Sequence, residues 1–433
     1  MKLETIKWKE LSEDEKIASL KRPVIESIEE QESVITEIFN EVKSNGDQAI
    51  KRYTKMYDGV EIDNLLMSNK EITSAFDRVP KTLIQSIENA IENVKTFHEK
   101  NFQSDTNKIE VRTGVNCQII KRPIENVGLY IPAGNNPLPS TAIMLGVPSS
   151  LAMNKESIVV SPPNDSGVVN DSIVVAAKLS GIGRICKVGG AQSIAALAYG
   201  TESIPQVDKI FGPGNSWVTK AKQMISLLNL PVSIDMPAGP TEVLIISDGN
   251  TNPEFIAYDL LSQAEHGVDS QVILISQNDS FLKKVAIEID KAISNIRTQE
   301  IAKISMKNSK LIFVDDIQEA INISNYYAPE HLIINCKNAE KLVQKISSAG
   351  SVFLGEWSPE SAGDYCSGTN HVLPTAGFAR SYSGLSVDSF CKSISVQSLT
   401  KKGLEMIGDD IINLAMAEGL EAHAKAVEVR IKK

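Results

Sequence analysis

The stretch KIFGPGNSWVTKAK, residues 209–222, contains a short apolar run, a glycine-rich turn and an amphipathic segment. The same order occurs in KVGGAQSIAAL, residues 187–197. Strands that alternate with helices form parallel sheets covered on both faces. The turns also expose backbone N–H groups that can bind an anionic phosphate. The pattern predicts an α/β fold, although glycine pairs without G-x-G-x-x-G spacing are more often plain turns than ligand sites.

This alternation of strand and helix runs in two blocks, from about residue 128 to 238 and from about 239 to 378. We therefore expect two related, doubly wound parallel-sheet domains, similar to incomplete Rossmann folds. Residues 28–127 are assigned, together with 239–378, to the first α/β domain, and residues 128–238 form the second. Residues 1–27 and 379–433 are expected to be small helical extensions, and the second of these could reach a neighbouring subunit.

The composition argues against several classes of partner. The chain has 433 residues and a net charge of -10 without long runs of one sign, which does not suit a nucleic-acid surface. No stretch reaches the ~18 apolar residues of a membrane-spanning helix, and the N-terminal residues lack an apolar signal region. Five scattered cysteines without C-x-x-C spacing fit a reducing compartment. We expect a soluble, cytoplasmic chain whose partners are small molecules.

Polar side chains follow three strands of the first block. Tyr130 ends the strand before IPAG, and Gln192 and Asn215 lie just past the two glycine turns. The carboxyl ends of parallel strands share one edge of a sheet, so the two turns together favour a nucleotide more than either does alone. A tyrosine in this place is by default a packing residue.

Two histidines in the predicted helical segments are weak candidates for functional residues. In DLLSQAEHGVDSQ, residues 259–271, Gln263 precedes His266 by three residues, so both project from one helical face. Zinc favours His, Cys, Asp and Glu, and an amide oxygen is a weak ligand. Taken alone, the pair is more often the polar end of a helix that stops at Gly267. His98, at the end of an earlier helical segment, is interpreted as a solvated surface residue.

The stretch NYYAPEHLIINC, residues 325–336, places Glu330 and His331 immediately before an apolar strand. A carboxylate beside an imidazole offers two proton-transfer groups of different pKa, which suits a reaction with more than one proton step. The alternative is a loop glutamate next to a hydrogen-bonded histidine.

Two later stretches contain further candidates. The long, glycine-rich GEWSPESAGDYCSGTNHVLPTAGFARSYSGLS, residues 355–386, is typical of a functional loop. It contains Asp364, a hard oxygen ligand, and His371, for which a structural hydrogen bond is the preferred interpretation. The Ala-rich MAEGLEAHAKAV, residues 416–427, contains Glu418 and His423, which would ordinarily be solvated positions of a helix.

Together these stretches resemble the histidinol dehydrogenase family, zinc-dependent enzymes of the last steps of histidine synthesis. The resemblance covers nearly the whole chain. It is carried by eight stretches in order: GLYIPAG, GGAQSIAALAYGT, KIFGPGNSWVTKAK, IDMPAGPTE, LLSQAEHG, YAPEHL, GDYCSGTNHVLPT and EGLEAHAKAV. Each stretch alone is modest evidence, but a chance occurrence of all eight in this order is implausible. The resemblance implies two related α/β domains with small terminal pieces, and an intertwined homodimer.

The resemblance also implies a role for each candidate residue. Glu330 and His331 would be the acid/base pair. The NAD contacts would be Tyr130, Gln192 and Asn215. The zinc ligands would be Gln263, His266, Asp364 and, from the partner subunit, His423. The residues around histidinol would be Thr241, Gln263, His266, His331, Asp364, Glu418 and His423. Position 241 is often serine in this family, and threonine keeps the hydroxyl while adding a methyl group.

The implied reaction is a zinc-dependent, four-electron oxidation of L-histidinol to L-histidine through histidinal, with two NAD. A different class of function is a zinc hydrolase, in which Glu330 activates a metal-bound water and the glycine turns bind a substrate phosphate or carboxylate. A third is a non-catalytic binding protein that captures its ligand between two lobes.

Overall fold

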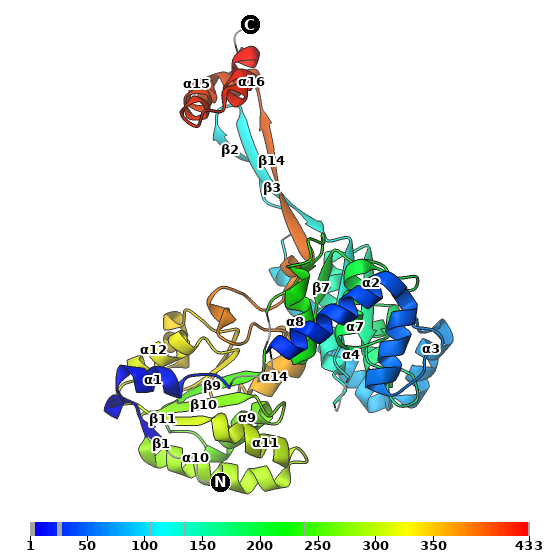
Figure 1. Ribbon diagram of the computed structural model, residues 1–433. Helices are drawn as coiled ribbons and strands as arrows, with labels where there is room; N and C mark the ends of the chain where they lie inside the picture. The colour runs from blue at the N-terminus through cyan, green and yellow to red at the C-terminus, as the bar shows by residue number, and fades with distance from the viewer. Residues whose placement is uncertain (1–4, 24–27, 104, 134–135, 238, 432–433) are drawn as a thin grey trace.

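A computed structural model describes residues 5–23, 28–103, 105–133, 136–237 and 239–431, without the side chains of residues 28–30. Two lobes are each built on a parallel sheet, and a long arm projects away from both lobes and carries the last two helices (Figure 1). The described helices include none that is long and apolar enough to cross a membrane.

One lobe contains a six-stranded parallel sheet in the order β1-β11-β10-β9-β12-β13. Its strands are β1 (Thr5–Lys7), β9 (Glu242–Ser247), β10 (Gln271–Ser276), β11 (Lys310–Phe313), β12 (His331–Asn335) and β13 (Ser351–Leu354). Its helices are α1 (Glu13–Ser19), α9 (Pro253–Ala264), α10 (Asp279–Ala292), α11 (Gln299–Ser305), α12 (Ile317–Tyr327), α13 (Ala339–Leu342) and α14 (Glu360–Tyr365). Strands β9 and β10 are buried at every position, because helices cover both faces of the sheet.

The other lobe contains a five-stranded parallel sheet in the order β6-β5-β4-β7-β8. Its strands are β4 (Asn126–Tyr130), β5 (Glu156–Ser161), β6 (Arg184–Lys187), β7 (Lys209–Phe211) and β8 (Ser233–Ile234). The helices between them are α5 (Pro139–Ala152), α6 (Asp171–Leu179), α7 (Gly190–Tyr199) and α8 (Ser216–Ile225).

The two sheets share one connectivity. Numbered along the chain within each lobe, β4 to β8 and β9 to β13 both lie in the order 3-2-1-4-5. Each sheet therefore reverses its winding between its first and fourth strands, which is the topological switch point of a doubly wound fold. The two related α/β domains expected from the sequence are confirmed, and β1 is added at the edge of one of them.

The N-terminal helices lie on a different lobe from the one expected. Residues 28–127 were grouped with 239–378, whereas α2 (Ile28–Asp58), α3 (Asn69–Arg78) and α4 (Lys81–Asn101) pack on α7, α6 and α5 of the five-stranded sheet. Their apolar side chains are part of the two hydrophobic clusters on that sheet. Helical periodicity identifies an apolar face but does not identify the sheet that covers it.

The two extensions contain strands as well as helices. Residues 5–7 form β1, which pairs with β11. In the arm, β14 (Cys391–Leu399) pairs over its whole length with β3 (Val115–Pro123), which also pairs with β2 (Ile109–Arg112). Helices α15 (Lys401–Ala417) and α16 (Glu421–Ile431) follow at the tip of the arm (Figure 1). The C-terminal extension is thus a strand and two helices held to the rest of the chain by an antiparallel ladder.

His98 lies near the end of α4 and is only 3% exposed. The expectation of a solvated surface histidine was therefore wrong. The ring packs edge-on against Phe97, and burial lowers the pKa of His98 because it disfavours the charged imidazolium.

Candidate functional site

The amino-terminal edge of the six-stranded sheet brings together five of the candidate residues: Thr241, Gln263, Glu330, His331 and Asp364. Thr241 directly precedes β9, and Glu330 and His331 lie at the start of the neighbouring strand β12. Gln263 lies near the end of α9, which runs back from the carboxyl end of β9 to the start of β10. Ligands of open α/β sheets usually bind at the carboxyl ends of the strands, so this site lies on the opposite edge.

The Glu330 carboxylate is buried and has two hydrogen-bond donors. Its Oε2 atom accepts from the Thr241 hydroxyl at 2.6 Å and from the backbone N–H of Glu242 at 2.9 Å. The same hydroxyl lies 2.5 Å from Oε1 of Gln263. A hydroxyl has one proton and donates it to one acceptor at a time. Thr241 therefore connects the carboxylate to the amide of Gln263, and a serine in this place could do the same.

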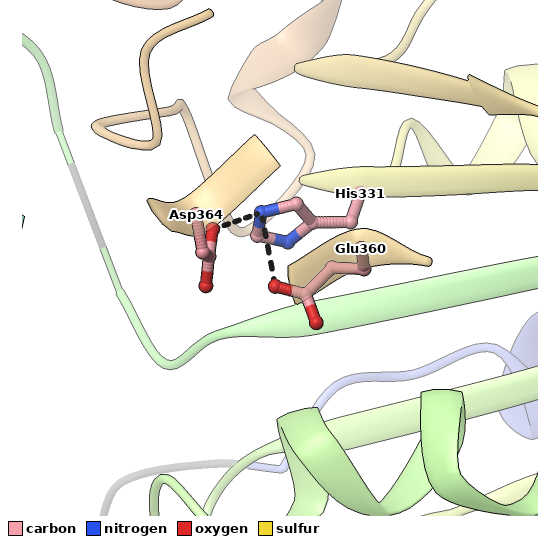
Figure 2. Close-up of side chains that lie close together, drawn as sticks. All are labelled: His331, Glu360 and Asp364. Carbon is pink, nitrogen blue, oxygen red and sulfur yellow. Dashed lines mark ion pairs between the residues drawn. The ribbon is translucent and has the colours of Figure 1, made fainter. Parts of the chain in front are cut away.

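The His331 imidazole lies between a backbone carbonyl and two carboxylates. Its Nδ1 atom is 3.2 Å from the carbonyl oxygen of Glu242, to which an N–H at this position donates. Its Nε2 atom is 3.5 Å from Oδ1 of Asp364 and 4.0 Å from Oε1 of Glu360 (Figure 2). Burial alone would lower the pKa of His331, but the neighbouring carboxylates of Glu330 and Asp364 raise it well above its ordinary value.

Glu360 is a site residue that the sequence reasoning missed. It begins α14 and is 1% exposed, and its Oε2 atom accepts from the Ser262 hydroxyl at 2.9 Å. Burial and the nearby Asp364 carboxylate raise the pKa of Glu360 to about 8, whereas His331 and His371 hold the pKa of Asp364 below its usual range in spite of burial. The four-residue spacing of Glu360 and Asp364, which places both on one helical face, is the sequence signal that could have found it.

Three buried polar atoms at this edge have no hydrogen-bond partner among the described residues: Nε2 of His331, Oε1 of Glu360 and Nε2 of Gln263. One ligand atom from each of His331, Glu360 and Asp364 can be chosen so that all three lie within 4.8 Å of one another. Nitrogen and oxygen donors of this kind suit a divalent cation such as zinc, and a cation would compensate the buried negative charge. The donor set fits a metal, although only Asp364 is shared with the ligand set that the family resemblance implies.

Three residues of the implied metal and substrate set stand apart from this buried cluster in the single chain. His266 follows α9 and is exposed, and the described part of the chain shows no hydrogen bond or ion pair of its side chain. Glu418 caps α15, and His423 lies in α16. Both helices are at the tip of the arm, far from the edge that holds His331 in the same chain (Figure 1).

The candidate nucleotide contacts lie at the carboxyl edge of the five-stranded sheet. Tyr130 ends β4, and its hydroxyl accepts from the backbone N–H of Gly190 at 3.4 Å. Gln192 is buried, and a Cβ atom on Gly190 would lie 2.6 Å from its Oε1 atom, so this turn requires glycine. Asn215 caps α8 by accepting from the N–H of Val218. Strands β4 and β7 flank the switch point, where a nucleotide is expected.

His371 connects the two lobes next to this site. Its Nδ1 atom is 2.8 Å from the carbonyl oxygen of Asp364, and its Nε2 atom is 3.2 Å from the hydroxyl of Thr141 at the start of α5. The N–H of Nδ1 donates to the carbonyl, so Nε2 accepts from the threonine. The structural hydrogen bonds expected of this histidine are present, and they join α5, the helix after β4, to α14, which contains Asp364.

Comparison with known proteins agrees with this architecture. The model of the Histidinol dehydrogenase family matches residues 21–431. The chain belongs to the histidinol dehydrogenase family. The histidinol dehydrogenases of Colwellia psychrerythraea and Vibrio parahaemolyticus are 47% and 43% identical to it, over 99% and 100% of this chain and 98% and 99% of theirs. The crystal structure of histidinol dehydrogenase from Elizabethkingia anophelis matches with a TM-score of 0.96 and 46% identity, over 99% of this chain and 98% of that one.

The double contact of the Thr241 hydroxyl can be tested by two substitutions. Thr241→Ala removes a donor to a buried carboxylate and should lower the free energy of unfolding by about 1–3 kcal/mol. Thr241→Ser keeps the hydroxyl and should remain within about 1 kcal/mol of the wild type, the cost of one buried methyl group. Urea denaturation followed by circular dichroism measures both. Equal destabilisation by alanine and serine would mean that the methyl group, not the hydroxyl, matters here.

Proposed function

We propose that this chain oxidises L-histidinol to L-histidine, through histidinal, with two NAD, in the last steps of histidine biosynthesis. Its family supports this substrate and reaction. The observation that carries the proposal is the buried pair Glu330 and His331, 3.5 Å apart between carboxylate Oε2 and Nδ1, beside the Asp364 carboxylate, which lies 3.5 Å from Nε2 of His331. Two bases side by side suit a reaction with two different proton transfers.

In the first oxidation, the neutral imidazole of His331 would accept the hydroxyl proton of histidinol at Nε2 while hydride leaves the substrate carbon for NAD. A cation at this edge would favour that neutral form, because it offsets the carboxylates that raise the pKa of His331. The geometry supports this role, because Nδ1 donates to the carbonyl of Glu242 and Nε2 has no partner among the described residues. In the second oxidation, the Glu330 carboxylate takes a proton from the water that attacks histidinal, and hydride leaves for a second NAD. Alcohol, water and two NAD thus give carboxylate, two NADH and released protons. Burial of the site keeps the aldehyde from escaping.

We propose zinc as the metal, held by Gln263, His266 and Asp364 with His423 of the partner subunit. When bound, zinc would hold the imidazole and amine nitrogens of histidinol and so position its hydroxyl group. Glu418 of the partner subunit would complete the substrate pocket, and Thr241 would fix the amide of Gln263. Tyr130, Gln192 and Asn215 would contact NAD at the switch point of the other lobe, where Thr141 and His371 join the two lobes.

We propose a cytoplasmic homodimer in which each arm reaches the other subunit. The arm carries large exposed apolar side chains, a surface that a second copy can cover. These are Ile394, Leu399, Met406, Leu414, Met416 and Leu420. The same arm carries the residues that one chain does not bring to its own site. All five cysteines are free thiols, which fits a reducing compartment.

The reaction is tested by mixing the purified chain with zinc, L-histidinol and NAD and following the absorbance of NADH. Two NADH should form for each histidinol consumed, a chelator should stop the reaction, and added zinc should restore it. Histidinol recovered unchanged would support a binding protein instead. Hydrolysis of a model ester without NADH formation would support the zinc hydrolase.

The shared site predicts complementation between two inactive variants. A subunit with Glu330→Gln still donates an intact His423, and a subunit with His423→Ala still has an intact Glu330. Dimers mixed from equal amounts should recover about a quarter of wild-type activity, because half are mixed and one of their two sites is intact.

The matched control for this experiment mixes Glu330→Gln with His331→Ala subunits. These two residues lie on the same subunit at each site, so every site of the mixed dimer is damaged and no activity should return. No recovery in the His423→Ala mixture either would contradict the supply of His423 by the partner subunit.

A further inference from the structure

Asp58 lies beside the candidate nucleotide turn, although it comes from a helix outside the two repeating blocks. After a kink at Gly46, α2 runs antiparallel along α7. At one end, Asp47 accepts a hydrogen bond from the Ser203 hydroxyl just past α7. Asp58 is three turns further along α2, ~16 Å at 1.5 Å per residue, and so reaches the start of α7 at Gly190. Its charge acts on the Tyr130 hydroxyl, which contacts that turn.

The surroundings of Asp58 are unfavourable to a carboxylate. It is the last residue of α2, and the negative end of a helix dipole disfavours an anion. Burial raises its pKa to about 6. Its Oδ2 atom is buried without a hydrogen-bond partner, and the described structure shows no ion pair of Asp58. The nearest cation in the sequence, Lys55, pairs with the exposed Glu61 instead. Unpaired, partly buried charges of this kind are typical of ligand sites.

We propose that the Asp58 carboxylate binds the vicinal hydroxyl groups of the adenosine ribose of NAD and excludes NADP. Two hydroxyl donors would satisfy the unpaired carboxylate, and a phosphate on the 2′-oxygen would be repelled by it. The pyrophosphate would then lie on the exposed N–H groups at the start of α7. This inference rests on the proposed use of NAD.

The strand order shows which ribose this is. Asp58 lies beside the helix that follows β6, at one edge of the five-stranded sheet. The opposite edge is β8, and the chain leaves it to reach Thr241 at the catalytic edge of the other lobe. The nicotinamide must approach Glu330 and His331, so the ribose at the distant β6 side belongs to the adenosine half.

The test measures kcat/KM for NAD and for NADP, with histidinol as the alcohol, in the wild type and in Asp58→Asn and Asp58→Ala. Loss of a hydrogen bond to a charged group should raise KM for NAD ~10-fold or more with little change in kcat. The ratio of kcat/KM for NAD to kcat/KM for NADP should fall by more than this factor. Without the carboxylate the 2′-phosphate is no longer repelled, so kcat/KM for NADP should rise. The matched control is Glu61→Gln, which removes an exposed carboxylate three residues away and should leave both values unchanged.

Two further measurements separate the inference from its alternatives. The melting temperatures of the Asp58 variants should equal or exceed that of the wild type, because each substitution removes an unpaired negative charge from the C-terminal end of α2. Dissociation constants for NAD and NADP without histidinol should show the same contrast, even if the alcohol were a different one. An unchanged preference for NAD over NADP in both Asp58 variants, or an equal loss in Glu61→Gln, would overturn the inference.

Discussion

The amino-terminal edge of the six-stranded sheet buries three carboxylates, and the rest of the site depends on how their charge is compensated. Glu242, Glu330 and Glu360 are at most 7% exposed. A buried carboxylate is costly unless it is paired or hydrogen-bonded. Arg22 forms a two-point ion pair with Glu242 and stacks on the Tyr327 ring. Glu330 instead receives hydrogen bonds, and Glu360 receives one from a serine.

This distribution leaves negative charge facing the His331 imidazole. The ion pair with Arg22 compensates the charge of the Glu242 carboxylate. The backbone carbonyl of Glu242 accepts a hydrogen bond from Nδ1 of His331 and so orients the imidazole ring. In front, Asp364 and Glu360 approach Nε2 without forming a hydrogen bond to it. The buried atoms at this edge that lack hydrogen-bond partners, together with the nearby carboxylates, suit the binding of a cation and of a substrate nitrogen. The edge therefore holds Glu330 and His331 through hydrogen bonds and leaves Nε2 of His331 without a partner among the described residues.

The sequence predicts local order well and packing between distant elements poorly. The alternation of strands and helices predicted both parallel sheets. Glu330 and His331 are neighbours in the sequence, so their proximity could be predicted without the fold. The lobe covered by α2 to α4 could not be predicted, because an apolar helix face fits either sheet. Glu360 was missed because its four-residue spacing from Asp364 is a signal only once this glycine-rich stretch is recognised as the helix α14.

The central claim is that the two neighbouring bases serve different steps, and half-reactions of Glu330→Gln test it most directly. The rates of NADH formation should be measured separately from L-histidinol and from histidinal, with Thr241→Ser as a control that leaves both bases in place. The loss should be far larger with histidinal, because Glu330 would activate the water that attacks the aldehyde while His331 would still accept the alcohol proton. Equal loss in the two half-reactions would contradict it.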